Sequence, residues 1–335
     1  MPAPRIGQAT SHPSGAAVPE QGLLVYHTYE NYDSAGSTGV LWLYDFATRA
    51  PAVPVSQPWT SVSAPMNAIF SADGQWLVFM GVANEEWNIF LWEVGSDSEP
   101  VNLTNNYWPG NWLTNEDPKF SADMSKVWWK RGGDIAVAPL IFDDEVPRLD
   151  LEAMSMLTQD GQVKETGENE DWMPMPVEDD SALYFIQGTG PHADIVRAEL
   201  AWDESGRASI VGEIQPVAAE QGIQEYYPIL DYGATASQED DTVWYARWKA
   251  DDDRGDALYR LRNGVHERSP LALDWADTAD PWPVPNSQMV LYCATTGPGW
   301  AYELRSGNTE TGESVVLDLQ DGTTNSHLGP AYWAP

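Results

Sequence analysis

Short apolar runs recur along the whole chain, and polar turns rich in Asp, Gly, Ser and Asn separate them. Typical runs are WLVFM at Trp76–Met80 and IFLWEV at Ile89–Val94. Runs of this length, rich in β-branched and aromatic residues, predict β-strands, whereas no stretch has the 3.6-residue period of an amphipathic helix. The pattern therefore predicts an all-β protein.

The expected strands group into units of four. In the first full unit they are Met66–Ser71, Trp76–Met80, Ile89–Val94 and Pro100–Thr104. A turn at Ala72-Asp73-Gly74 joins the first two strands, and an equivalent turn follows in the second unit at Ala122–Ser125. Three weaker units come after these.

One position in each unit shows the period of the repeat. It is held in turn by Ala68, Pro118, Pro174, Pro228, Pro281 and Pro330, with spacings of 50, 56, 54, 53 and 49 residues. A repeat of this length with four short strands is typical of a propeller blade. The sequence therefore predicts a six-bladed β-propeller of four-stranded blades.

The two ends of the chain supply the last blade. The stretch Leu23–Val55 holds strands but no leading strand, while Leu328–Pro335 holds a leading strand alone. Pairing Tyr332 and Trp333 with the first stretch would complete a sixth blade and leave no open sheet edge. We expect one propeller domain over residues 22–335, preceded by a flexible Pro/Ala/Ser/Gly-rich leader over residues 1–21.

The best-formed unit resembles the repeat of the TolB-like propellers, also called WD40-like or PD40 repeats. Phe70–Phe79 reads F-S-A-D-G-Q-W-L-V-F, and N-I-F-L-W at Asn88–Trp92 and N-L-T at Asn102–Thr104 follow it. The family pattern has Pro where this chain has Ala72 and Ala122. This resemblance implies the propeller fold, and it does not imply one function, because a fold of this kind hosts many.

The composition of the chain narrows the classes of molecule that it could bind. The chain has 51 acidic and 17 basic residues and a net charge of −34. Nucleic acid is excluded as a partner because it requires a basic surface. No stretch reaches the ~18 apolar residues of a membrane helix, and the single Cys293 excludes an internal disulfide. An acidic surface keeps a protein soluble and monomeric, and we expect a periplasmic or extracellular monomer.

Candidate site residues gather where the inner strands begin and the second strands end, because both lie at one mouth of the channel. We expect the beginnings of the inner strands to contribute Asn67, Glu116, Asp117, Asp171, Trp172, Glu225, Tyr226, Asp280 and His327. We expect the ends of the second strands to contribute His27, Tyr29, Lys130, Arg131, Arg247 and Trp248.

Carboxylates, guanidinium groups and exposed aromatic rings together suit a carbohydrate, because they bond to hydroxyls and stack on C–H faces. Lys130, Arg131 and Arg247 would bind anionic groups, and an Arg could clamp an acidic sugar's carboxylate. The alternative is that the acids only cap strands, that the cations neutralise them, and that the channel holds water. A third possibility is a non-catalytic scaffold that binds proteins through its faces.

Cleavage of the sugar is a further hypothesis. Paired carboxyl groups could act as acid and base on a glycosidic bond, with Glu116, Asp171, Glu225 and Asp280 as the candidates. A lyase would instead need a base such as His27 or a tyrosine. Oligogalacturonide lyases with a related propeller use a His-rich metal site, and at most three of the five His here could converge.

One loop is a candidate for a divalent cation. Residues 251–256, DDDRGD, are similar to an oxygen-ligand calcium loop, in which acids and a Gly turn surround the ion. The loop lacks the bidentate Glu of such sites, so a solvated acidic loop is the competing interpretation. Which cofactor the protein uses, if any, stays open.

Overall fold

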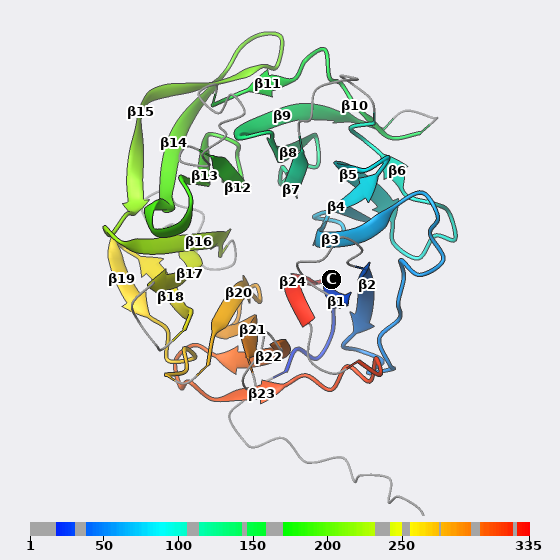
Figure 1. The fold of residues 1–335 in the computed structure, drawn as a ribbon, viewed down its shortest axis with the longest axis vertical. Helices are drawn as coiled ribbons and strands as arrows, with labels where there is room; N and C mark the ends of the chain where they lie inside the picture. Colours follow the sequence, from blue (N-terminus) through cyan, green and yellow to red (C-terminus); the bar gives the residue numbers. More distant parts are fainter. Residues whose placement is uncertain are drawn as a thin grey trace, which may run out of the picture.

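The structure is a computed structural model that describes residues 18–30, 38–105, 114–142, 146–158, 170–231, 242–249, 255–274, 276–295, 302–323 and 327–335. These residues form six antiparallel sheets arranged as blades around a central channel (Figure 1). No α-helix occurs among them, and one short 3₁₀ turn, η1, covers Gly190–His192. The prediction of a six-bladed β-propeller is confirmed.

We number the blades I to VI in the order of the ring. Blade I contains β24 (His327–Trp333), β1 (Leu23–Glu30) and β2 (Thr38–Asp45). Blade II contains β3 (Ser63–Phe70), β4 (Trp76–Ala83), β5 (Glu86–Glu93) and β6 (Val101–Asn102). Blade III contains β7 (Asn115–Phe120), β8 (Lys126–Arg131) and β9 (Asp134–Ile141), with two short outer strands, β10 (Arg148–Leu149) and β11 (Ser155–Met156).

The remaining blades each have four strands. Blade IV contains β12 (Asp171–Pro176), β13 (Ala182–Gln187), β14 (Asp194–Trp202) and β15 (Ala208–Ala218). Blade V contains β16 (Ile223–Leu230), β17 (Val243–Lys249), β18 (Ala257–Arg262) and β19 (Val265–Arg268). Blade VI contains β20 (Thr278–Pro283), β21 (Met289–Thr295), β22 (Tyr302–Asn308) and β23 (Ser314–Val316).

The two chain ends close the ring as predicted. β24 pairs antiparallel with β1, with Leu24 opposite Tyr332 and Leu23 opposite Trp333. At the end of the stretch Leu23–Val55, pairing with β2 is limited to one bridge, between Leu43 and Val53. Of the predicted leader over residues 1–21, residues 1–17 lie outside the described part of the chain.

The hydrophobic core lies between the blades. Among the described residues there are six buried apolar clusters, one at each contact between neighbouring blades. Successive residues of a second strand enter different clusters: Val127 and Trp129 pack toward blade II, while Trp128 packs toward blade IV. A strand buried on both faces needs a continuous apolar run, which explains runs such as WLVFM and much of the tryptophan.

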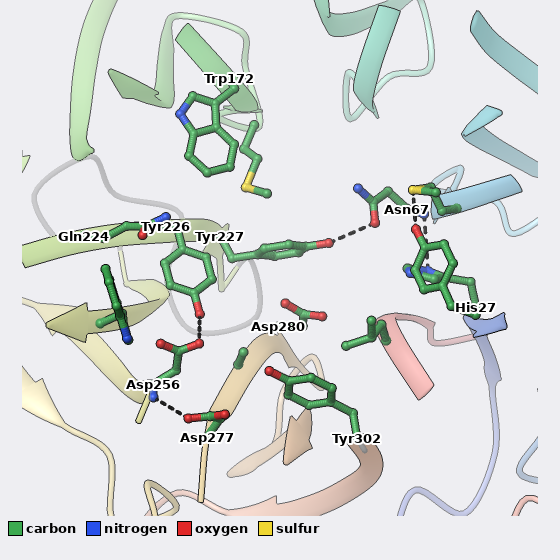
Figure 2. A pocket seen from close by; sticks show the side chains of 16 residues that line it. His27, Asn67, Trp172, Gln224, Tyr226, Tyr227, Asp256, Asp277, Asp280 and Tyr302 are labelled. Atoms are coloured by element: carbon green, nitrogen blue, oxygen red, sulfur yellow. Dashed lines mark hydrogen bonds between the residues drawn. The ribbon is translucent and has the colours of Figure 1, made fainter. Parts of the chain in front are cut away.

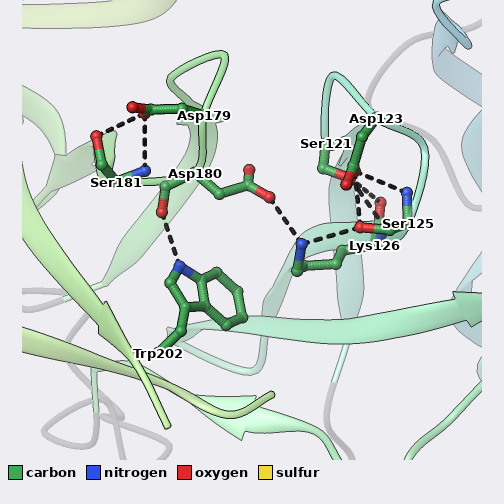
Figure 3. A network of polar contacts seen from close by, with 8 residues as sticks. All are labelled: Ser121, Asp123, Ser125, Lys126, Asp179, Asp180, Ser181 and Trp202. Carbon is green, nitrogen blue, oxygen red and sulfur yellow. Dashed lines mark hydrogen bonds and ion pairs between the residues drawn. The ribbon is translucent and has the colours of Figure 1, made fainter. Parts of the chain in front are cut away.

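The first hairpin turn of a blade is fixed by its own side chains. In blade III, the Asp123 carboxylate accepts hydrogen bonds from the hydroxyl of Ser121 (2.7 Å) and from the backbone N–H (2.9 Å) and hydroxyl (2.7 Å) of Ser125 (Figure 3). Burial alone would raise the pKa of Asp123, but these bonds outweigh it and lower the pKa to about 2. The Ser and Asp of the repeat motif are therefore turn-forming residues.

A polar clasp joins this turn to the next blade. Lys126 Nζ lies 2.9 Å from Asp180 Oδ2 in the corresponding turn of blade IV. The ammonium group also lies 4.8 Å from the centre of the Trp202 ring, and the Trp202 indole donates to the Asp180 carbonyl (Figure 3). A cation over an aromatic face adds to the attraction of the ion pair. Blades III and IV are thus held together at their turns as well as through their core.

Candidate functional site

Every inner strand has an irregularity at the same place. The residue before the repeat's Pro position has a left-handed backbone; these residues are Asn67, Asp117, Met173, Tyr227, Asp280 and Gly329, with φ between 49° and 60°. The strand pairing shifts register at each of these points. Such bulges redirect side chains, and several of these residues meet one another in the channel.

Tyr227 reaches across the channel. Its strand β16 in blade V lies opposite β3 of blade II in the ring (Figure 1), and its hydroxyl donates to Asn67 Oδ1 at 3.1 Å. Asn67 Nδ2 in turn donates to Asp117 Oδ1 at 2.9 Å. Figure 2 shows the Tyr227 ring extended between the two sides. The three side chains therefore form a polar bridge over the channel.

A cavity of about 750 Å³ opens at this bridge. Its lining comes from every blade except blade III and consists of His27, Tyr29, Met66, Asn67, Trp172, Met173, Gln224, Tyr226, Tyr227, Trp248, Asp256, Asp277, Ala279, Asp280, Tyr302 and Leu328 (Figure 2). Ligand pockets usually have volumes of about 300–1,000 Å³ and mix aromatic walls with a few polar groups. This cavity has both properties.

Three carboxyl groups lie on one side of the cavity. Asp256 accepts a hydrogen bond from the Tyr226 hydroxyl, and its backbone N–H donates to Asp277 Oδ1 at 3.0 Å. Asp280 Oδ2 accepts the Gly329 N–H at 3.0 Å and the thiol of Cys293 at 3.6 Å. Burial raises the pKa of both Asp256 and Asp280 to about 6, and the neighbouring acids add to this for Asp256.

Aromatic rings form much of the cavity wall, and those of Tyr226 and Tyr302 lie beside the acids (Figure 2). Trp172 lines the cavity and is half-buried, and its indole N–H donates to the Gly188 carbonyl at 2.9 Å, which fixes the ring in place (Figure 2). Trp248 is also half-buried. Tyr29 donates to the sulfur of Met66. Rings held in this way are suited to stacking against a ligand because little side-chain freedom remains to be lost.

His27 is the deepest polar side chain of the cavity, with 2% of its surface exposed. The Asn67 N–H donates to His27 Nδ1 at 3.4 Å, so the ring proton lies on Nε2, to which no described residue bonds. Burial lowers the pKa of His27 to about 3. A Cβ at Gly329 would lie 2.6 Å from the ring, so glycine leaves the space that the imidazole occupies.

The cavity brings together seven of the fifteen predicted site residues: His27, Tyr29, Asn67, Trp172, Tyr226, Trp248 and Asp280. Asp117 lies at its edge, bonded to Asn67. The other predicted residues are engaged elsewhere, in pairs within or between blades.

In blade III the two candidate cations are held by neighbouring side chains, and acids neutralise Lys130. Lys130 pairs with Glu116 at 2.8 Å and with Glu170 at 3.0 Å. Arg131 donates to Asn115 Oδ1 at 3.0 Å. These contacts match the strand register, in which Glu116 is opposite Lys130 and Asn115 is opposite Arg131. For Lys130 this arrangement matches the alternative interpretation of the sequence, in which the cations neutralise the acids.

Blades IV and V show the same arrangement. Asp171 is buried and lies opposite Gln187, whose amide approaches it at 3.4 Å. Glu225 is opposite Arg247, whose Nε lies 3.5 Å away, and Arg247 also pairs with Glu220. Burial outweighs the nearby guanidinium and raises the pKa of Glu225 to about 7. Asp171 and Glu225 precede the cavity residues Trp172 and Tyr226, and neighbouring side chains of a strand face opposite ways.

His327 belongs to a separate buried network in blade I. Its Nε2 lies 2.8 Å from Asp321 Oδ2, and Asp321 also accepts a 2.6 Å hydrogen bond from Tyr26. The ring lies 5.4 Å from that of Tyr26, within the contact with blade VI. His327 does not line the cavity.

The sequence interpretation passed over several lining residues. Asp277 and Tyr302 lie just before β20 and at the start of β22, while Asp256 ends the acidic run that was read as a calcium or solvated loop. Residues 251–254 of that loop lie outside the described residues, so the calcium hypothesis concerns positions that the structure does not describe. Within the described ranges, no group of three or more His, Cys, Asp or Glu side chains is placed to hold a metal ion. No helix in this part of the chain is long and apolar enough to cross a membrane.

Comparisons with known proteins agree on the fold. No family model matches the sequence, and no curated protein matches it. Among solved structures, TolB from Acinetobacter baumannii is 15% identical with a TM-score of 0.63, over 95% of this chain and 68% of that one. Hydrazine synthase from Kuenenia stuttgartiensis is 12% identical with a TM-score of 0.61, over 95% of this chain and 47% of that one.

A putative TolB from Agrobacterium tumefaciens is 11% identical with a TM-score of 0.53, over 89% of each chain. Identities this low establish architecture and leave activity open. Together with the six blades, these likenesses show that the chain has a TolB-like β-propeller fold.

Proposed function

We propose that this protein binds the end of a carbohydrate chain in the cavity at the mouth of its channel. The observation that carries the proposal is the combination of aromatic rings and hydrogen-bonding groups around a cavity of about 750 Å³. Sugars need such a combination, because their hydroxyls donate and accept hydrogen bonds while their C–H faces are apolar. Trp172 and Trp248 supply faces, and Asn67, Gln224 and Asp280 supply polar atoms.

The polar bridge favours a chain end over a threaded chain. Tyr227 spans the channel to Asn67, so a polymer passing through would have to break that hydrogen bond and displace the ring. A terminal sugar needs neither change. The mode of binding that follows is capture of one end, with the rest of the chain leaving toward solvent.

The lining also bears on the charge of the sugar. Among the described residues, no Lys or Arg lines the cavity: Lys130 and Arg247 pair with acids elsewhere, and Arg131 donates to the Asn115 amide. A uronate would therefore meet carboxylates without a guanidinium clamp. This arrangement supports a sugar without a carboxylate over an acidic one.

Binding is better supported than cleavage. Of the four carboxyl groups considered for acid/base catalysis, Asp280 alone is among the described residues of the lining, so a second carboxyl group would have to be Asp256 or Asp277. The proposed setting is a monomer in the periplasm or outside the cell.

The test is calorimetric titration with a panel of neutral and uronic oligosaccharides, with product analysis for reducing ends and unsaturated uronates. Loss of one stacking ring should weaken binding at least about tenfold, so Trp172→Ala and Trp248→Ala are the informative variants. Trp76→Ala is the matched control, because that half-buried ring packs on Phe142 away from the cavity. If no sugar binds the unaltered protein, the proposal fails and the protein-binding scaffold remains.

A further inference from the structure

The carboxyl groups of the cavity have no cation of their own. Asp256, Asp277 and Asp280 all line it, and no described Lys or Arg does. The titratable groups that face Asp280 are Tyr226 and Tyr227 from β16, Cys293 from β21, Tyr302 from β22, and Asp256. None of these can carry a positive charge, and the neighbouring β24 offers Asp280 the N–H of Gly329.

Asp280 is more than nine-tenths buried, yet half of its carboxyl group is unused. Its exposed fraction is 8%. Oδ2 accepts two hydrogen bonds, from Gly329 and Cys293, whereas no described residue donates to Oδ1. Figure 2 shows the carboxyl group at the centre of the view, between the rings of Tyr227 and Tyr302. Because Asp280 lines the cavity and is itself more than nine-tenths buried, its unused oxygen is placed to accept a hydrogen bond from a donor that a ligand brings.

The walls around these acids also favour a positive charge. Trp172, Trp248, Tyr226 and Tyr302 line the same space. An aromatic face attracts a cation through its quadrupole, most strongly when the site is shielded from water. Over longer distances, the net charge of −34 attracts cationic molecules and repels anionic ones.

We propose that the sugar unit held in the cavity carries an ammonium group, so that the ligand class is an amino sugar oligosaccharide. The proposal rests on the carbohydrate function proposed above. The ammonium group donates to Asp280 Oδ1, with Asp256 and Asp277 as further acidic neighbours. The neutral His27 donates through Nε2–H to a sugar hydroxyl on the other side of the cavity, and an indole covers a face of the ring.

The discriminating experiment compares two forms of one oligosaccharide. A β-1,4-linked glucosamine tetramer and its N-acetylated counterpart share a backbone, but only the first has ammonium groups. Calorimetric titration of both at pH about 6.5 and matched ionic strength should give at least about tenfold tighter binding of the aminated form, since charge-assisted hydrogen bonds are roughly twice as strong as neutral ones. Its affinity should peak at intermediate pH, because the carboxyl groups take up protons below and the amines lose protons above.

Variants separate the charge pairing from simple fit. Asp280→Asn should bring the affinity for the aminated form down to that for the N-acetylated form, and the affinity for the latter should change less than about twofold. Glu213→Gln is the control, because it removes one negative charge at an exposed position of β15 outside the cavity. Asp277→Asn is a second variant that lowers the cavity's charge without touching Asp280's hydrogen bonds.

The outcomes distinguish the two proposals. If the N-acetylated form binds as tightly as the aminated form, the ammonium inference is overturned and the carbohydrate function stands. If neither form nor any neutral sugar binds, both proposals fail. If a lysine-rich peptide of matched charge binds while every sugar fails, the cavity recognises a protein partner, and both are overturned.

Discussion

The buried carboxyl group of Asp280 makes a prediction about stability that needs no ligand. Its pKa is about 6 in the folded protein, against an ordinary value of 3.8. Because the folded state holds this proton more tightly than the unfolded state, the contribution of Asp280 to stability falls as pH rises from about 4 to about 6. Above that range, ionised Asp280 lowers the free energy of unfolding by about 3 kcal/mol relative to a neutral group.

Asp280→Asn replaces this group with a neutral one of the same shape, whose oxygen can still accept the Gly329 N–H. For the two pKa values, the penalty in the unaltered protein is about 1 kcal/mol at pH 4.5 and about 3 kcal/mol at pH 8. The free energy of unfolding of the variant, relative to that of the unaltered protein, should therefore rise by about 2 kcal/mol from pH 4.5 to pH 8. Any packing effect of the substitution that does not depend on pH cancels in this comparison.

Urea denaturation followed by tryptophan fluorescence, at pH 4.5, 6 and 8, measures this difference. Glu213→Gln controls for the change in net charge, because its exposed side chain has no role in the cavity. If the difference between Asp280→Asn and the unaltered protein is the same at pH 4.5 and pH 8, Asp280 is not a buried carboxyl group of raised pKa.

Three further substitutions test parts of the framework. Lys126→Met leaves the Asp180 carboxylate without its cation and should lower the free energy of unfolding by about 2 kcal/mol. Adding Asp180→Asn should restore most of this stability. A double variant as unstable as Lys126→Met alone would count against the polar clasp. Gly74→Ala places a Cβ 2.3 Å from an indole ring of blade I and should cost about 2 kcal/mol. Gly95→Ala, with a similar positive φ but open space around the added Cβ, should lose less stability in the same urea denaturation. Tyr227→Phe should cost about 1 kcal/mol in urea denaturation by removing the bond across the channel, and an unchanged midpoint would contradict that bond.

The architecture was predictable because each repeat unit carries a version of the same pattern of strands and turns. The Pro position and the apolar second strand recur at spacings of 49 to 56 residues, and the first two full units share the Ser-x-Asp turn, so a weak signal in one blade is supported by the others. Trp128 and Trp129 illustrate the physical reason: a strand buried between two blades needs large apolar side chains at consecutive positions. Blade I has three strands and one isolated bridge where the other blades have a fourth strand. The sequence did not predict this difference because an isolated bridge and a short strand have similar sequences.

The site was harder to predict because it depends on which side chains of an inner strand point into the cavity. Trp172 lines the cavity while its neighbour Asp171 is buried elsewhere, and residue type alone did not decide between them because carboxylates and aromatic rings both suit a carbohydrate site. The left-handed residue in each inner strand also changes which side chains enter the channel, and Met173 and Tyr227 have no preference for that conformation. Pairs such as Glu116 and Lys130 were placed at the correct end of their strands, and their neutralisation was one of the alternatives; the strand register was needed to choose it for this pair.

The pairing of β24 with β1 has a consequence for how the folded protein opens. The last strand of a chain ordinarily frays and exchanges its amide hydrogens quickly. Here Ala331 and Tyr332 pair with β1 in the middle of blade I and pack into the contacts with blades II and VI. Releasing them requires separating two blade contacts at once, so their amides should exchange as slowly as those of the most protected strands. Hydrogen exchange at the end of this chain would then report on rupture of the whole ring.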